Sequence, residues 1–118
     1  MKKITFLAFS LLIISCKQKQ EITVSAVPSI ALGKQLFETN NCTACHQINQ
    51  KIVGPSLQNM ALIYNQKKGN LVSFLKGEAE AIVAPEQYES MKINLEITKT
   101  MPDNDLKSLE LYILSNSK

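Results

Sequence analysis

Two patterns of hydrophobic residues divide the chain. Residues 4–14 form a mostly apolar run, whereas from residue 29 onward apolar residues recur every three or four positions with polar residues between them. This spacing is typical of amphipathic helices, and no segment shows the strong alternation of a half-buried strand. The pattern therefore predicts an all-α fold of roughly four or five short helices.

Capping residues set the limits of the first helices. Ser29 is a suitable N-cap for a helix over residues 30–40, and Asn40-Asn41 can end it because asparagine tolerates left-handed backbone geometry. Ser56 can cap a second helix, which Gly69-Asn70 would end. The expected apolar face of this second helix consists of Leu57, Met60, Ala61 and Tyr64.

The second half of the chain contains signals for further helices. A short one is expected from Leu71 to near Gly77, and Pro85-Glu86 suits another helical start, because proline is tolerated in the first turn. Residues 92–100 are expected to form a loop. The last helix is predicted over residues 102–114, where its apolar face would carry Leu106, Leu109, Tyr112 and Ile113.

The apolar run near the N-terminus predicts an export signal. It follows the basic head Met1-Lys2-Lys3 and is shorter than the roughly 20 apolar residues that a membrane-spanning helix needs. Its end, Ile13-Ile14-Ser15-Cys16, resembles a bacterial lipoprotein processing site, which implies cleavage before Cys16 and lipid on its thiol. The chain would then consist of a signal peptide (residues 1–15), a lipid-anchored tether (residues 16–28) and one domain (residues 29–118).

Composition argues against nucleic-acid binding. The chain of 118 residues has a net charge of +3, contains no arginine, and has no basic run after the N-terminal head. Nucleic-acid-binding domains need lysine and arginine clustered on one face. A length of this order allows one domain, whose own hydrophobic core would be small.

The cysteines carry the most specific signal in the sequence. They number three, which is odd for an exported chain, where thiols are expected to be paired or otherwise occupied. Lipid on Cys16 would leave Cys42 and Cys45, which stand in Cys42-Thr43-Ala44-Cys45-His46. This C-x-x-C-H motif is typical of covalent haem c attachment, in which both thiols bond the porphyrin vinyl groups and the adjacent histidine binds the iron.

Three other uses of a C-x-x-C pair compete with haem attachment. A thioredoxin-like redox pair would follow a strand, but the residues before Cys42 predict a helix. A structural zinc site needs four ligands, and the sequence offers no second Cys/His pair to complete it. A disulfide between residues three apart is geometrically awkward and leaves His46 without a role. Haem attachment is the interpretation that uses all three side chains.

Residues 30–116 resemble the small class I bacterial c-type cytochromes. The resemblance rests on Gly33 to Phe37 (G-x-x-L-F), the C-x-x-C-H motif, Gly54-Pro55-Ser56-Leu57 and the spacing of the last helix. It implies a cytochrome c-like fold around one covalent haem c, which would fill the centre of the domain. It also implies that the Pro55 carbonyl oxygen accepts a hydrogen bond from His46, and that the first helix crosses the last. In that crossing Gly33 and Phe37 would meet Leu109 and Tyr112.

The same resemblance implies that a methionine binds the iron opposite His46. The chain has a single histidine, so a second histidine ligand is impossible, and Met60, Met91 and Met101 are available once Met1 is lost. Met91 is the expected sixth ligand and Met101 is the alternative. Met101 also suits a hydrophobic staple before the last helix, Met60 suits packing, and any of these methionines could simply fill a gap in the core.

A haem iron bound by histidine and methionine has no open coordination position, which favours outer-sphere transfer of single electrons. We therefore expect an electron carrier, not an enzyme, that docks briefly to redox proteins such as an oxidase, a reductase or a dehydrogenase. The alternatives are a haem-based gas-binding or sensing module and a fixed haem subunit of a larger respiratory complex. Haem c attachment and lipid on Cys16 imply a periplasmic or cell-envelope location at a membrane surface. Tyr64 and Lys67-Lys68 could approach the haem propionates, although the lysines equally suit a solvated pair.

Overall fold

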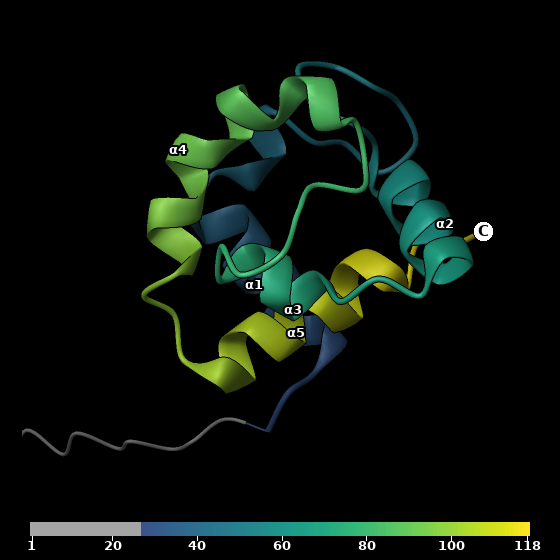
Figure 1. Cartoon of the computed structure of the whole chain (residues 1–118). Coiled ribbons are helices and arrows are strands. Elements are labelled where there is room, and N and C mark those ends of the chain that lie inside the picture. The colour runs from purple at the N-terminus through teal and green to yellow at the C-terminus, as the bar shows by residue number, and fades with distance from the viewer. Residues whose placement is uncertain (1–26) are drawn as a thin grey trace, which may run out of the picture.

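The computed structural model describes residues 27–118 as an assembly of short helices (Figure 1). The expected signal peptide, Cys16 and nearly all of the expected tether lie outside the described residues. The elements are α1 (Ile30–Thr39), a 3-10 turn η1 (Cys42–Ala44), α2 (Leu57–Lys67), α3 (Leu71–Leu75), a 3-10 turn η2 (Pro85–Gln87), α4 (Tyr88–Thr98) and α5 (Asp103–Leu114). The described part contains five α-helices and no strand, which confirms the all-α prediction.

Side-chain caps start the helices where the sequence predicts them. The Ser29 hydroxyl accepts a hydrogen bond from the backbone N–H of Leu32 at 3.1 Å, at the start of α1. The Ser56 hydroxyl accepts one from the backbone N–H of Asn59 at 3.1 Å, at the start of α2. These bonds satisfy N–H groups that have no partner inside the helix. Helix α2 ends slightly earlier than expected, because Lys68 already takes the left-handed conformation with a φ of 54°.

Helices α1 and α5 cross in close contact, as the family resemblance implies. A Cβ atom on Gly33 would lie 1.9 Å from the carbonyl oxygen of Ser108, so only glycine allows the two backbones to approach this closely. The ring of Phe37 packs edge-on against that of Tyr112, with centroids 5.5 Å apart. Ser108, rather than the expected Leu109, is the nearest neighbour of Gly33.

Replacing Gly33 with alanine is expected to lower the free energy of unfolding by about 1–3 kcal/mol, the usual cost of overpacking. The added methyl group would push α5 away from α1, because the atom it meets is backbone and cannot rotate aside. Urea denaturation of the haem-loaded protein would measure the effect. Gln35→Ala, on the exposed side of the same helix, is the matched control. A Gly33→Ala variant as stable as that control would contradict the close crossing.

The buried core joins four helices and leaves α4 largely outside it. The residues of this core cluster come from α1, α2, α3 and α5: Phe37, Leu57, Tyr64, Leu71, Leu75, Leu106, Leu109 and Ile113. Helix α4 lies on the opposite side of the domain from α2 (Figure 1) and buries only Leu95 and Thr98. The side chains between α4 and the rest of the domain therefore leave a pocket open between them.

The prediction of a loop over residues 92–100 is wrong, because α4 continues through Thr98. Its apolar side chains do not form one stripe. Leu95 is buried, whereas Ile93 is 75% exposed and faces solvent. The amphipathic pattern of this helix is weak because one of its sides faces a pocket rather than a protein core. None of the helices in residues 27–118 has the length and hydropathy of a membrane span.

Candidate haem-binding site

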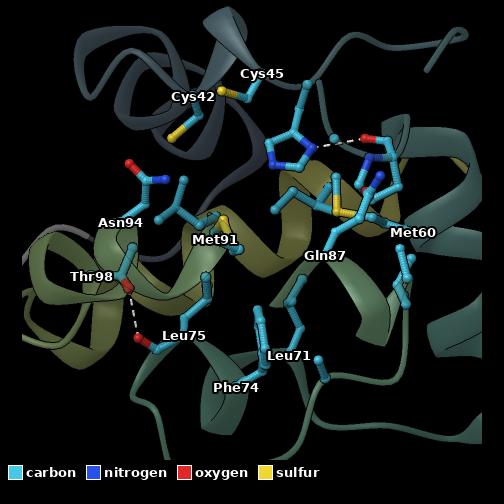
Figure 2. Close-up of a pocket in the computed structure, with 18 of the residues that line it drawn as sticks. Cys42, Cys45, Met60, Leu71, Phe74, Leu75, Gln87, Met91, Asn94 and Thr98 are labelled. Atoms are coloured by element: carbon cyan, nitrogen blue, oxygen red, sulfur yellow. Dashed lines mark hydrogen bonds between the residues drawn. The ribbon is translucent and has the colours of Figure 1, made fainter. Parts of the chain in front are cut away.

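A deep pocket opens between the cysteine-containing turn and α4 (Figure 2). Its empty space measures about 1220 Å³, including the open mouth. Most of its walls are apolar, and no charged side chain of the described residues lines it. The apolar lining includes Phe37, Val53, Leu71, Phe74, Leu75, Ile82, Val83, Leu109 and Ile113. Such a pocket suits a large, mostly apolar ligand.

A tight turn places both cysteines of the motif on one side of the pocket (Figure 2). Asn41 has a left-handed backbone with a φ of 58°, which ends α1 and starts η1. The backbone N–H groups of Cys45 and His46 both donate to the Cys42 carbonyl oxygen, at 3.2 and 3.0 Å. Both thiols are free, and burial raises the pKa of the Cys42 thiol. At neutral pH Cys42 is therefore an uncharged thiol in an apolar wall.

The ring of His46 is fixed by the loop that follows it. Its Nδ1 lies 2.7 Å from the carbonyl oxygen of Pro55, a hydrogen bond in which the ring N–H donates (Figure 2). A Cβ atom on Gly54 would lie 2.4 Å from the Cε1 of His46, so the loop can close on the ring only with glycine at this position. With Nδ1 occupied by its proton, the other ring nitrogen, Nε2, carries the lone pair that a metal ligand needs.

Helix α4 supplies most of the facing wall. Met91, Asn94 and Thr98 of this helix line the pocket, and Figure 2 shows them opposite the cysteines. Met60 of α2 also lines it, in addition to packing against the core. Met101 does not line the pocket, and packs against the core cluster immediately before α5.

The expected neighbours of the propionates are only partly present. Tyr64 lines the pocket, but neither Lys67 nor Lys68 does. The Nζ of Lys67 instead donates to the carbonyl oxygen of Ile82, at 3.3 Å. Sequence reasoning missed Gln87, Asn94 and Thr98 as pocket residues. Reading residues 92–100 as a helix would have placed Asn94 and Thr98 on the side of Met91, since they follow it by three and seven positions.

The residues present fit a covalently attached haem. Two thiols, one oriented imidazole and a methionine thioether surround an apolar pocket. The buried Oε1 of Gln87, which also lines the pocket, has no hydrogen-bond partner within the described residues. An amide oxygen only accepts hydrogen bonds, so this oxygen lacks a donor that the described residues do not supply. The zinc interpretation gains no support, because no three His, Cys, Asp or Glu side chains of residues 27–118 cluster as metal ligands.

Comparison with known proteins agrees with this geometry. The cytochrome c family model matches residues 30–117. The chain belongs to the cytochrome c family. It is 42% identical to cytochrome c-552 of Nitrosomonas europaea over 43 residues, which cover 36% of this chain and 41% of that protein. It is 40% identical to cytochrome c-551 of Azotobacter vinelandii over 37 residues, covering 31% of this chain and 45% of that protein. The matched stretches thus span less than half of either relative.

Family membership confirms three predictions made from the sequence. The chain is a small class I c-type cytochrome, and its helical structure agrees with the cytochrome c fold. Its cofactor is covalently bound haem c.

Ionisation of Tyr64 is expected to destabilise the domain at high pH. Burial raises the pKa of its hydroxyl from 10.0 to about 12. The stability that the neutral phenol contributes is fully present below pH 10 and is lost as the pH rises from 10 to 12, because the unfolded chain releases this proton more readily. We expect Tyr64→Phe to lose less stability than the parent protein over this range, as measured by urea denaturation at each pH. Equal losses in the two proteins would show that Tyr64 does not titrate with folding.

Proposed function

We propose that this protein carries single electrons through a haem c attached to Cys42 and Cys45 and bound axially by His46 and Met91. The observation that carries the proposal is the arrangement of the pocket walls. An imidazole held by Pro55 lies on one wall, and a helix bearing a methionine forms the other. Two axial ligands leave no open position on the iron for substrate.

The bound haem would supply an iron that alternates between ferric and ferrous states, with the electron arriving from one redox protein and leaving to another. The side chains of the pocket hold and shield this cofactor. The Pro55 carbonyl oxygen keeps the ring of His46 in one orientation, which lowers the reorganisation needed on electron transfer. The apolar walls exclude water. No aspartate, glutamate or lysine of residues 27–118 lines the pocket.

Position in the pocket favours Met91 as the sixth ligand. Met91 projects from α4 into the pocket, whereas Met101 is packed on the core cluster outside it. Met60 also lines the pocket, but it belongs to α2, directly after the loop that holds His46. A methionine on the facing helix is better placed to bind the opposite side of the iron.

The N-terminal segment supports a membrane-bound carrier. Residues 1–15 would act as a signal peptide, lipid on Cys16 would anchor the chain, and the polar residues up to 28 would tether the domain to a membrane surface. The domain would then work in the periplasm or cell envelope. Its partners would be redox proteins such as an oxidase, a reductase or a dehydrogenase.

Potentiometric titration and carbon monoxide binding test the proposed function on protein from a host that matures c-type cytochromes. An electron carrier is expected to titrate as a one-electron couple and to bind carbon monoxide slowly when reduced, because Met91 must first leave the iron. Rapid carbon monoxide binding at neutral pH would instead favour the gas-binding or sensing module. Protein without haem absorbance, with both thiols of the motif open to alkylation, would overturn the proposal.

A further inference from the structure

Helix α4 is attached to the rest of the domain mainly through its C-terminal half. Its buried residues are Leu95, at 1% exposed, and Thr98, at 6% exposed. The N-terminal half, which carries Met91, faces the pocket. The position of Met91 therefore depends on contacts made one to two turns further along the same helix.

The hydroxyl of Thr98 makes a buried hydrogen bond between helices. Its Oγ1 donates to the carbonyl oxygen of Leu75 at 2.6 Å, and it lies 3.2 Å from the carbonyl oxygen of Leu95 in its own helix. A threonine inside a helix usually bonds only to its own preceding turn. Leu75 is the last residue of α3, where carbonyl groups have no partner within the helix. Thr98 thus links the end of α4 to the end of α3.

A second close approach occurs at the same junction. Gly77, just after α3, has a φ of 74°, and a Cβ atom there would lie 2.5 Å from the Cε of Lys99. The contacted atom lies near the end of the flexible Lys99 side chain, which can move aside, so it is the positive φ that favours glycine here.

This link and the methionine lie along one side of α4. Met91, Leu95 and Thr98 are spaced four and three residues apart, which places them on the same face of a helix. Met91, Thr98 and Leu75 all line the same pocket, and Figure 2 shows the Thr98–Leu75 bond beside Met91. A change in the roll of α4 at Thr98 would therefore also move the thioether of Met91.

We propose that Thr98 is a positioning residue for the sixth ligand: its hydrogen bond to Leu75 fixes the roll of α4 and so holds the Met91 thioether toward the haem iron. This inference rests on the proposed ligation by Met91. It differs from a purely structural role, in which the hydroxyl would only satisfy the Leu75 carbonyl oxygen and Met91 would bind equally well without it.

Competition with imidazole in the oxidised, haem-loaded protein measures how firmly Met91 is held. Thr98→Val keeps the shape of the side chain but removes the donor. We expect it to bind imidazole about tenfold more tightly, since loss of a buried hydrogen bond changes equilibria by roughly this factor. We also expect its far-red methionine-to-iron absorption band to weaken. Thr98→Ser keeps the hydroxyl and should restore both properties.

Thr100→Val is the matched control. The Thr100 hydroxyl is exposed and donates a local hydrogen bond to the carbonyl oxygen of Ile97, three residues earlier, at 2.9 Å. This variant should bind imidazole as the parent protein does. If Thr98→Val does not mature, Thr98→Cys, whose thiol is a weak donor, is expected to show the same direction of change.

The result that would overturn the positioning role is a Thr98→Val protein that unfolds at lower urea concentration but binds imidazole with unchanged affinity. A Thr98→Ser protein that behaves like Thr98→Val would also overturn it. Met91→Ala is measured in the same series. If that variant keeps the far-red band, the ligand assignment and the positioning role both fail; if it loses the band while Thr98→Val binds imidazole normally, only the positioning role fails.

Discussion

Replacing Met91 with alanine is expected to abolish the far-red absorption band of the oxidised protein and to lower its reduction potential. A thioether ligand favours ferrous iron, so its loss stabilises the ferric state. The vacant position would also let the reduced protein bind carbon monoxide rapidly. Visible spectroscopy and a potentiometric titration of the purified variant would measure these changes.

The other methionines supply matched controls for this prediction. Met101→Ala should keep the band, because Met101 packs on the core cluster outside the pocket and its loss affects stability instead. Met60→Ala changes the pocket wall on α2 and should also keep the band. A Met91→Ala protein with an unchanged band, together with loss of the band in Met101→Ala, would assign the ligand to Met101.

The haem-free chain is expected to lack a cooperative fold. The pocket reaches the middle of the domain, and six residues of the core cluster also form its walls: Phe37, Tyr64, Leu71, Leu75, Leu109 and Ile113. Without the porphyrin these side chains would meet water, at a cost of roughly 25 cal/mol for each Å² of apolar surface. Helix α4 would lose most of its contacts, because Leu95 and Thr98 are its only buried residues.

A Cys42→Ala/Cys45→Ala double variant tests this expectation, since it cannot attach haem. Far-ultraviolet circular dichroism should show reduced helix content, and urea should give a broad loss of signal rather than a sharp transition. The haem-loaded parent protein in the same buffer is the control. A double variant with full helix content and a sharp transition would show that the protein part folds on its own.

Local chemistry explains why much of the fold could be predicted from the sequence. Ser29 and Ser56 each cap a helix through a hydrogen bond to a residue three positions later, so a short stretch of sequence contains the whole signal. The crossing of α1 and α5 is an implication of the family resemblance, and Gly33, whose missing side chain admits the Ser108 backbone, permits it. The pocket turn is likewise encoded within the C-x-x-C-H motif and the left-handed Asn41 before it.

A helical start at Pro85-Glu86 was predicted, but the extension of α4 to Thr98 was not, because the environment of this helix is not encoded in its own residues. Its pocket side carries Met91, Asn94, Ile97 and Thr98, which mixes polar and apolar groups, and Ile93 is exposed to solvent. An amphipathic pattern arises only where one side of a helix meets a protein core. Gln87 was missed for a related reason, since it lies just before α4 and faces the pocket rather than the core.

The two walls of the pocket come from stretches that are far apart in the sequence. Cys42, Cys45 and His46 precede α2, whereas the facing wall is formed largely by residues 81–98. Porphyrin coupling outside the cytoplasm would act on a chain that has no cooperative fold, in which the attachment motif is open. The second half of the polypeptide would then fold against the attached ring and close the pocket.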